Sequence, residues 1–364
     1  MERPHSKKGQ QRMKNRILPI ITMICLLALL LTACTGSGNT ATSWGGATIT
    51  DSAVYFADGT MIYALKSENG NTIWSYPEKA SATRAFLAAP VVAGEQLLVG
   101  DIASNLTSLS IRDGKENWQF EDATGKYIDS PLVVGEMIIA PNADGTLYAL
   151  DLNGNKVWTF TAEHSFWAQP VTDGQIVYAP SLDHFLYALD LATGELKWKT
   201  ELKASLVARP TLLDGTIYIG NLDGQVFAVD SGNGDILWEQ EVAGGVWSAP
   251  LLIEGQLYFG DQTGMVYVLN AADGSITSSF ETESPMLGSG VSNSEGVFFG
   301  NEKGELVLFG FDGSKKWSRP VDVGAIYSNL VINNDMIIVV TNKGEKPMVA
   351  LNTEGNEIWY FTTK

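Results

Sequence analysis

Tryptophan returns at a nearly constant spacing through most of this 364-residue chain. The successive gaps are 44, 40, 40, 40, 79 and 42 residues, so the gap of 79 is a double step, and Ser278 stands at its vacant position. A period of this size indicates an array of repeated supersecondary units. Eight units of about 40 residues occupy residues 44–364, which we expect to form one domain. The repeating tryptophans are Trp74, Trp118, Trp158, Trp198, Trp238, Trp317 and Trp359.

Each unit contains four short runs that are rich in Val, Ile, Leu, Tyr and Phe. Turn sequences separate the runs, for example Asp58-Gly59, Asp144-Gly145 and Asp223-Gly224. Runs and turns of this kind predict four antiparallel strands per unit. No segment after residue 34 has helical periodicity. The sequence therefore predicts an all-β fold, an eight-bladed β-propeller of four-stranded antiparallel blades. Proline often opens the first run, at Pro90, Pro131, Pro170, Pro210 and Pro250.

The spacing of Ala188, Gly194 and Trp198 in the fourth unit resembles the tryptophan-docking motif of propellers with PQQ-like (quinoprotein-type) repeats. The resemblance implies that each indole packs between neighbouring blades. A small residue leaves room for the ring, and glycine permits a positive φ in the turn. We therefore interpret the seven tryptophans as structural, and we expect the seam that has Ser278 in place of tryptophan to be the weakest.

The first 33 residues have the pattern of a secretory signal peptide. Residues 1–16 carry six basic side chains and one acidic one, and the apolar run that follows ends at Leu31. This run is short for a membrane span, which needs about 20 residues. The segment from Leu31 to Cys34 resembles the lipobox of bacterial lipoproteins, which implies cleavage after residue 33 and acylation of Cys34. Residues 34–43 would then be a flexible, lipidated tether; the alternative is an uncleaved anchor with an incidental cysteine.

The chain is strongly acidic, with a formal net charge of −17. From residue 34 onward it has 18 basic and 40 acidic residues. Nucleic-acid binding and electrostatic adhesion to anionic lipids both need clustered Lys and Arg. We therefore expect no nucleic-acid partner, and we expect membrane attachment through a lipid on Cys34.

Sequence motifs for catalysis or metal binding are absent. Quinoprotein dehydrogenases share the repeat, but their vicinal disulfide has no counterpart, because Cys25 lies in the expected signal peptide. His164 and His184 are the only histidines after residue 34, too few for most metal sites. His184 occupies the turn position where other units have glycine. We expect no catalytic residue, no metal and no cofactor; a PQQ-dependent oxidoreductase is the opposing hypothesis.

The size, the lipobox and the single-domain layout resemble the BamB family of lipoproteins. That family consists of non-enzymatic scaffolds in the machinery that inserts β-barrels into outer membranes. The resemblance implies an extracytoplasmic, lipid-anchored location at the outer membrane or cell surface and a protein partner in the envelope, a β-barrel assembly complex where an outer membrane exists. Thr35, which follows the lipidated cysteine, permits outer-membrane sorting. The alternative is a surface lipoprotein that binds a solute, a glycan or a peptide.

One charged residue interrupts a column of small or uncharged residues at the start of the units. We expect this column to lie where the inner strands converge on the axis. Arg209 there could hold a carboxylate or phosphate; the alternatives are pairing with Asp129 or snorkelling. The residues one position before the proline slot are Gly46, Ala89, Ser130, Gln169, Arg209, Ala249, Ser289 and Ser328.

A second column, three positions before the proline slot, is large and apolar. We interpret it as core, although its tryptophans also suggest binding. Gln169, Trp167, Trp247, Tyr327 and Asp129 are the further candidates for a binding rim around Arg209. The members of this column are Trp44, Leu87, Ile128, Trp167, Val207, Trp247, Leu287 and Ile326.

Overall fold

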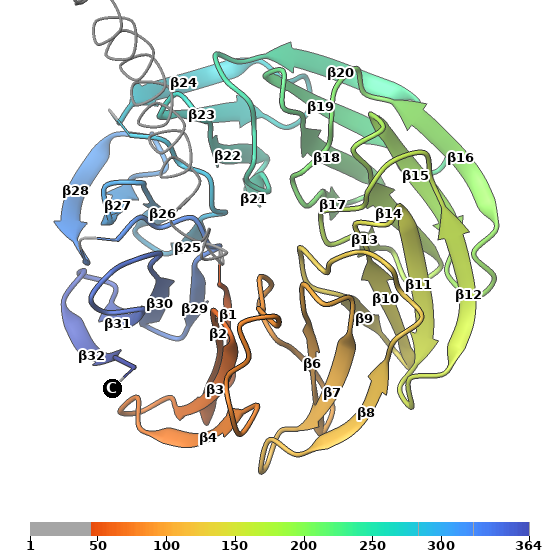
Figure 1. Ribbon diagram of the computed structural model, residues 1–364. Helices are drawn as coiled ribbons and strands as arrows, with labels where there is room; N and C mark the ends of the chain where they lie inside the picture. The colour runs from red at the N-terminus through yellow and green to blue at the C-terminus, as the bar shows by residue number, and fades with distance from the viewer. Residues whose placement is uncertain (1–44, 283, 323, 364) are drawn as a thin grey trace, which may run out of the picture. The chain divides into compact units, whose positions relative to one another are not determined.

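The computed structural model describes residues 45–282, 284–322 and 324–363. The expected signal peptide, Cys34, the tether and Trp44 lie outside the described residues. Within the unit Ser43–Lys364, the described residues form eight four-stranded antiparallel sheets arranged in a ring (Figure 1). This architecture confirms the predicted eight-bladed propeller. No helix in the described part of the chain is long and apolar enough to cross a membrane.

Every blade is a simple meander that runs outward from the axis of the ring (Figure 1). The innermost strands are two or three residues long, shorter than the apolar runs suggest, and the prolines directly precede them. They are β1 (Ala47–Ile49), β5 (Val91–Ala93), β9 (Leu132–Val134), β13 (Val171–Thr172), β17 (Thr211–Leu213), β21 (Leu251–Ile253), β25 (Val291–Asn293) and β29 (Val331–Asn333).

The two middle strands of each blade are buried on both faces, because each blade is covered by its neighbours on either side. The second strands are β2 (Ala53–Asp58), β6 (Gln96–Gly100), β10 (Met137–Pro141), β14 (Ile176–Pro180), β18 (Thr216–Gly220), β22 (Gln256–Gly260), β26 (Gly296–Gly300) and β30 (Met336–Val340). The third strands are β3 (Met61–Lys66), β7 (Leu106–Ser110), β11 (Thr146–Asp151), β15 (Phe185–Asp190), β19 (Gln225–Asp230), β23 (Met265–Asn270), β27 (Glu305–Phe309) and β31 (Met348–Asn352).

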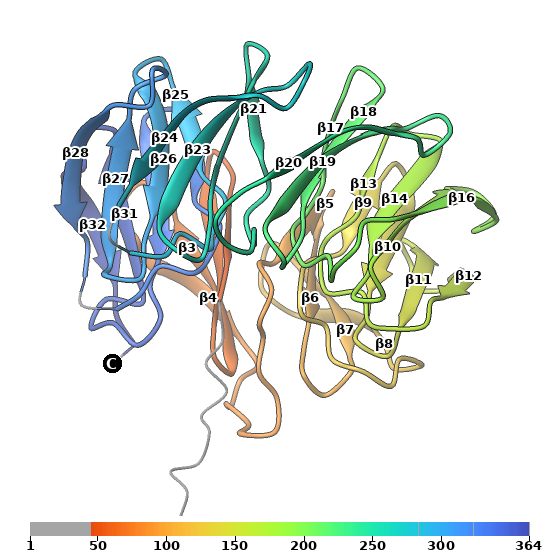
Figure 2. The ribbon, with the colours of Figure 1, turned by 90° about the horizontal axis from the view of Figure 1, so that it is seen from above.

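The outermost strands carry the repeating tryptophans, and a β-bulge in the pairing of the third and fourth strands precedes each of these positions. A bulge bends the strand and re-aims the side chains beside it. These strands are β4 (Thr72–Tyr76), β8 (Glu116–Phe120), β12 (Lys156–Thr161), β16 (Leu196–Glu201), β20 (Ile236–Glu241), β24 (Ile276–Glu281), β28 (Lys315–Pro320) and β32 (Glu357–Phe361). Figure 2 shows the same ring turned so that the blades are seen from above.

Each indole packs on a glycine of the next blade. A methyl group added to Gly194, whose φ is 73°, would lie 2.6 Å from Cδ2 of Trp158. The Trp158 Nε1–H donates to the Leu191 carbonyl at 2.9 Å, also across the seam. Trp359 of the last blade packs in the same way on Gly70 of the first blade and donates to the Ser67 carbonyl at 2.9 Å. The contact that joins successive blades therefore also closes the ring.

Different side chains fill the seam that lacks its tryptophan. The ring of Phe280, two residues after Ser278, packs against Gly313, the glycine of the seventh blade. Ser278 Oγ donates to the Asp312 carbonyl at 3.4 Å. Ser278 pairs with Val268 on the third strand of its blade. In five of the blades that have the tryptophan, the residue paired with it is alanine. The small side chain of Ser278 is therefore accompanied by a larger side chain on the partner strand. The period alone did not reveal this substitution.

The packing predicts that Gly194→Ala will lower the free energy of unfolding by about 2–4 kcal/mol, because the new methyl group meets the Trp158 indole and the backbone is left-handed. Gly174 is the matched control: its φ is 93°, and nothing lies within 4 Å of an added methyl group. Gly174→Ala should cost only about 1 kcal/mol. Urea unfolding of both variants measures the difference, and equal losses would contradict the seam contact.

At the seam that has Ser278 in place of tryptophan, we expect Phe280→Ala to lower the free energy of unfolding by about 3 kcal/mol. This is close to the roughly 3–5 kcal/mol expected for Trp198→Ala, because each change removes the ring that fills one seam. Ile276→Ala on the same outer strand is the control, since that side chain is 43% exposed. It should change stability by about 0.5 kcal/mol or less. If Phe280→Ala were as mild as the control, the phenylalanine would not be replacing the missing indole.

Candidate functional site

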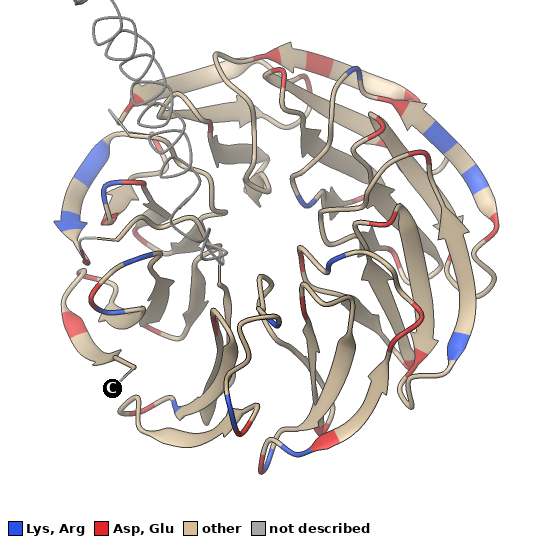
Figure 3. Ribbon diagram, viewed as in Figure 1, with Lys and Arg blue, Asp and Glu red and all other residues tan. Residues whose placement is uncertain are grey.

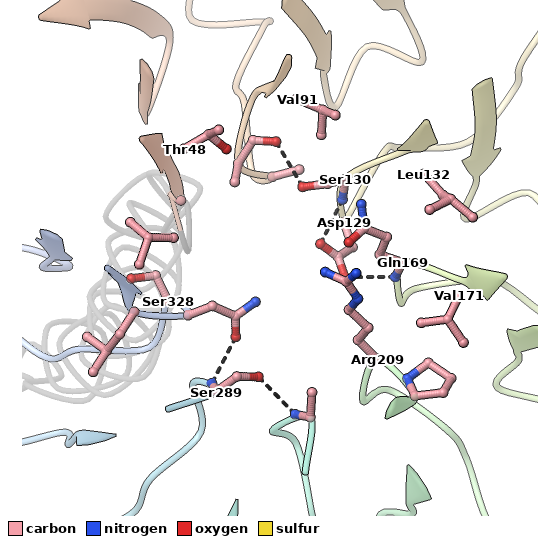
Figure 4. Close-up of a pocket in the computed structure, with 18 of the residues that line it drawn as sticks. Thr48, Val91, Asp129, Ser130, Leu132, Gln169, Val171, Arg209, Ser289 and Ser328 are labelled. Carbon is pink, nitrogen blue, oxygen red and sulfur yellow. Dashed lines mark hydrogen bonds between the residues drawn. The ribbon is translucent and has the colours of Figure 1, made fainter. Parts of the chain in front are cut away.

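The innermost strands surround a central channel with a cavity volume of about 1070 Å³. All eight blades contribute to its wall, through their first strands and the residues just before them (Figure 4). Most of the wall is aliphatic, from side chains such as Val91, Leu132, Leu251 and Val331. The first strands of the blades surround the axis, so the channel is a concave feature that the fold itself generates.

A polar collar lies at one end of this channel, at the residues that precede the first strands. Its hydrogen bonds link neighbouring blades (Figure 4). They run from Ser130 Oγ to the Ala89 carbonyl (2.8 Å), from Gln169 Nε2 to the Pro131 carbonyl (2.7 Å), from the Ala249 N–H to Ser289 Oγ (2.9 Å) and from the Ser289 N–H to Asn329 Oδ1 (2.8 Å).

In the eighth blade, the strand register corrects which residue stands one position before the proline slot. Val331 pairs with Ile338 as Val91 pairs with Leu98, so Leu330 occupies the proline slot of this blade. Asn329, and not Ser328, therefore belongs to the collar. The expected register was wrong because no proline marks the slot here. A slip of one residue exchanges the two faces of a strand.

The second column was also misread, because its members from the second to the seventh blade line the channel and are half-buried. Tyr327 takes the place that was given to Ile326. The core is the neighbouring column, one residue earlier, whose side chains are fully buried. These are Phe86, Tyr127, Phe166, Leu206, Val246, Met286 and Ile326.

Arg209 extends from the collar into the channel (Figure 4). The side chain is reached by water, yet the surrounding walls desolvate it, and this lowers the pKa of Arg209; the Asp129 carboxylate nearby acts in the opposite direction. Among the described residues, no carboxylate lies within ion-pair distance of the guanidinium, and it makes no hydrogen bond. Pairing with Asp129, one of the alternatives for this residue, is therefore not seen.

Asp129 is engaged by the backbone instead. Its Oδ1 accepts the N–H of Ser130 at 2.7 Å, and its Oδ2 accepts the N–H of Gln169 in the next blade at 2.8 Å (Figure 4). Burial raises the pKa of Asp129, and these two hydrogen bonds and the charge of Arg209 oppose the rise. The carboxylate therefore joins the third and fourth blades at the collar.

The three aromatic candidates, Trp167, Trp247 and Tyr327, also line the channel. The structure therefore places them in the same cavity as Arg209 and Gln169. The Trp167 Nε1–H is buried and has no hydrogen-bond partner among the described residues. Burial is the main cause of the raised pKa of Tyr327, with a smaller contribution from Glu302.

A ring of acidic residues, which was not predicted from the sequence, marks the opposite end of the inner strands. Each turn between a first and a second strand carries one exposed carboxylate, so the signal was present at the repeat period. Figure 3 shows the acidic and basic residues of the described ring. The eight carboxylates are Asp51, Glu95, Glu136, Asp173, Asp214, Glu254, Glu295 and Asp335. They create a negative potential at that mouth of the channel.

The structure also bears on metal binding and on His184. No group of three or more His, Cys, Asp or Glu side chains among the described residues is arranged to hold a metal ion. His184 has a φ of 77°, which confirms that it occupies a left-handed turn position.

Among solved structures, the chain is similar to BamB from Moraxella catarrhalis, with a TM-score of 0.72 and 19% identity over 84% of this chain and 92% of that one. It is also similar to the computationally designed Ika8 protein, with a TM-score of 0.73 and 14% identity over 89% of this chain and 98% of that one. At these identities the likeness shows a common fold.

A curated relative is the outer membrane protein assembly factor BamB of Yersinia pestis, 30% identical over 97 residues. That match covers 26% of this chain and 24% of the relative's length. A family model described as outer membrane protein assembly factor BamB matches residues 30–159, 143–285 and 262–364. These segments together span every blade of the ring. The chain therefore belongs to the BamB family of outer membrane protein assembly factors.

Proposed function

We propose that this protein is a non-enzymatic scaffold that binds other proteins at the bacterial cell envelope. A lipid on Cys34 anchors it to the membrane, and where an outer membrane exists the partner belongs to a β-barrel assembly complex. The observation that carries this proposal is the family match, which extends over the whole propeller. The proposal assigns the chain no catalytic residue, metal or cofactor.

The channel mouth at the collar is the proposed docking surface. It brings together Arg209, Gln169 and three aromatic side chains, and Arg, Trp and Tyr are the residues most enriched at the energetic centres of protein interfaces. The collar is held by hydrogen bonds between blades, so little ordering entropy is lost on binding. A rigid rim of this kind suits a scaffold.

The lipid anchor predicts that Cys34→Ser will move the protein from the membrane fraction to the soluble fraction. Several acyl chains make anchoring effectively permanent, and the substitution removes their attachment point. Fractionation of cells that express each form, with intact-mass analysis of the wild-type protein, measures this. Membrane retention of the variant, or an unacylated wild-type mass, would exclude the anchor.

The docking surface predicts that affinity capture with the full-length protein from native membranes will recover an envelope protein, and that Arg209→Ala will weaken its binding about 30-fold or more, as for a typical interface hot spot. Arg112→Ala is the matched control, because Arg112 is an exposed arginine in the turn between the third and fourth strands, where it pairs with Glu95 at 2.5 Å.

Recovery of barrel-assembly components would support the finer proposal. Recovery of a transporter or a glycan alone would contradict it. Unchanged binding of a verified partner to Arg209→Ala would remove the docking surface from the collar.

A further inference from the structure

The central channel contains a cation whose donors are unused. Of the described side chains that line it, only Arg209 and Asp129 are charged. The Asp129 carboxylate already accepts two backbone N–H groups. The Arg209 guanidinium has no hydrogen bond and no ion pair within the described part of the chain. A guanidinium has five N–H donors in a planar fork that matches a carboxylate.

The aromatic neighbour in the adjacent blade does not offer a second donor to the channel. Trp167 comes two residues before Gln169 in the fourth blade, and Arg209 comes two residues before the first strand of the fifth; the first strands β13 and β17 are in contact. Trp167 lines the channel, but its Nε1–H is shielded from water and therefore from a ligand in the channel. Arg209 is the cationic donor that a ligand can reach, so the matching ligand chemistry is an anionic acceptor.

The rest of the channel wall is mostly apolar. Aliphatic side chains from the first strands form most of the channel beyond the collar. The cavity volume of about 1070 Å³ is slightly above the range that is usual for small-molecule sites. An apolar body would remove this aliphatic surface from water. The lining residues of this kind are Val91, Leu132, Val171, Leu212, Leu251 and Val331.

The charges at the two ends of the inner strands specify the orientation of a charged ligand in the channel. The turns at the far mouth carry the eight exposed carboxylates, which repel an anion. Arg209 stands at the other end, at the collar. An anionic ligand would therefore place its charged group at the collar and its apolar body deeper in the channel.

We propose that the central channel binds an organic carboxylate that carries an apolar chain or ring. The carboxylate oxygens accept hydrogen bonds from the Arg209 guanidinium, and the apolar body packs on the aliphatic wall. This role goes beyond the proposed binding of a protein partner and does not depend on it.

The test uses the full-length protein in lipid nanodiscs, titrated calorimetrically with 4-phenylbutanoate, with empty nanodiscs as the blank. The neutral 4-phenylbutanamide is the matched probe, because it has the same apolar body and no charge. Wild-type protein should bind the acid at least about 10-fold more tightly than the amide. Equal affinities, or no binding of the acid, would overturn the proposal.

The variants locate the binding. Arg209→Gln should weaken binding of the acid about 10- to 100-fold and binding of the amide much less, because the amide carbonyl accepts a hydrogen bond from the guanidinium but forms no ion pair with it. Arg112→Gln should change neither affinity. Unchanged affinity of Arg209→Gln for the acid would contradict the proposal.

A spectroscopic readout separates direct contact from a structural effect. In ¹³C NMR of the carboxyl-labelled acid, the guanidinium should hold the pKa of the bound carboxyl below that of the free acid. In Arg209→Gln this lowering should disappear, and its persistence would exclude the contact. Because these measurements use purified protein and a small probe, they give the same answer whether or not the capture experiment recovers a protein partner.

Discussion

The contact between an indole and a glycine of the next blade supports the rest of the structure. Each blade is a sheet with two apolar faces, and it is stable only when both faces are covered. The indole covers the outer part of one seam, and its Nε1–H also reaches a carbonyl across that seam. Trp359 repeats the contact on Gly70, so the first and last blades share one apolar cluster and the ring has no open face.

Closing the ring has a consequence at the axis. Eight inner strands converge there, they are short, and small or polar residues precede them. Hydrogen bonds between blades hold the collar, whereas the Arg209 guanidinium has no acceptor among the described residues. A rigid wall that holds an unused, accessible donor is a preorganised binding surface. The candidate function therefore arises from the same constraint that stabilises the fold.

Much of the fold could be predicted from the sequence, because a repeat multiplies each weak local signal. Less of the candidate site could be predicted in this way. The channel-lining column was interpreted as core, since a large apolar side chain is equally suited to a core and to an apolar channel. In the eighth blade no proline marks the slot, so Asn329 was missed. Phe280 was missed as the replacement for an indole, because it stands two residues away from the repeat position.

The sequence by itself determined the number of blades, the four strands in each and the tryptophan spacing, because these depend on local turn chemistry and hydrophobic alternation repeated at one period. It also placed Arg209 at the axis. Only the tertiary structure decided that Arg209 and Asp129 do not pair, that Asp129 accepts backbone N–H groups, and that Trp167 retains an unpaired donor. These are relations between different blades. They depend on ångström-scale distances that a repeat period does not encode.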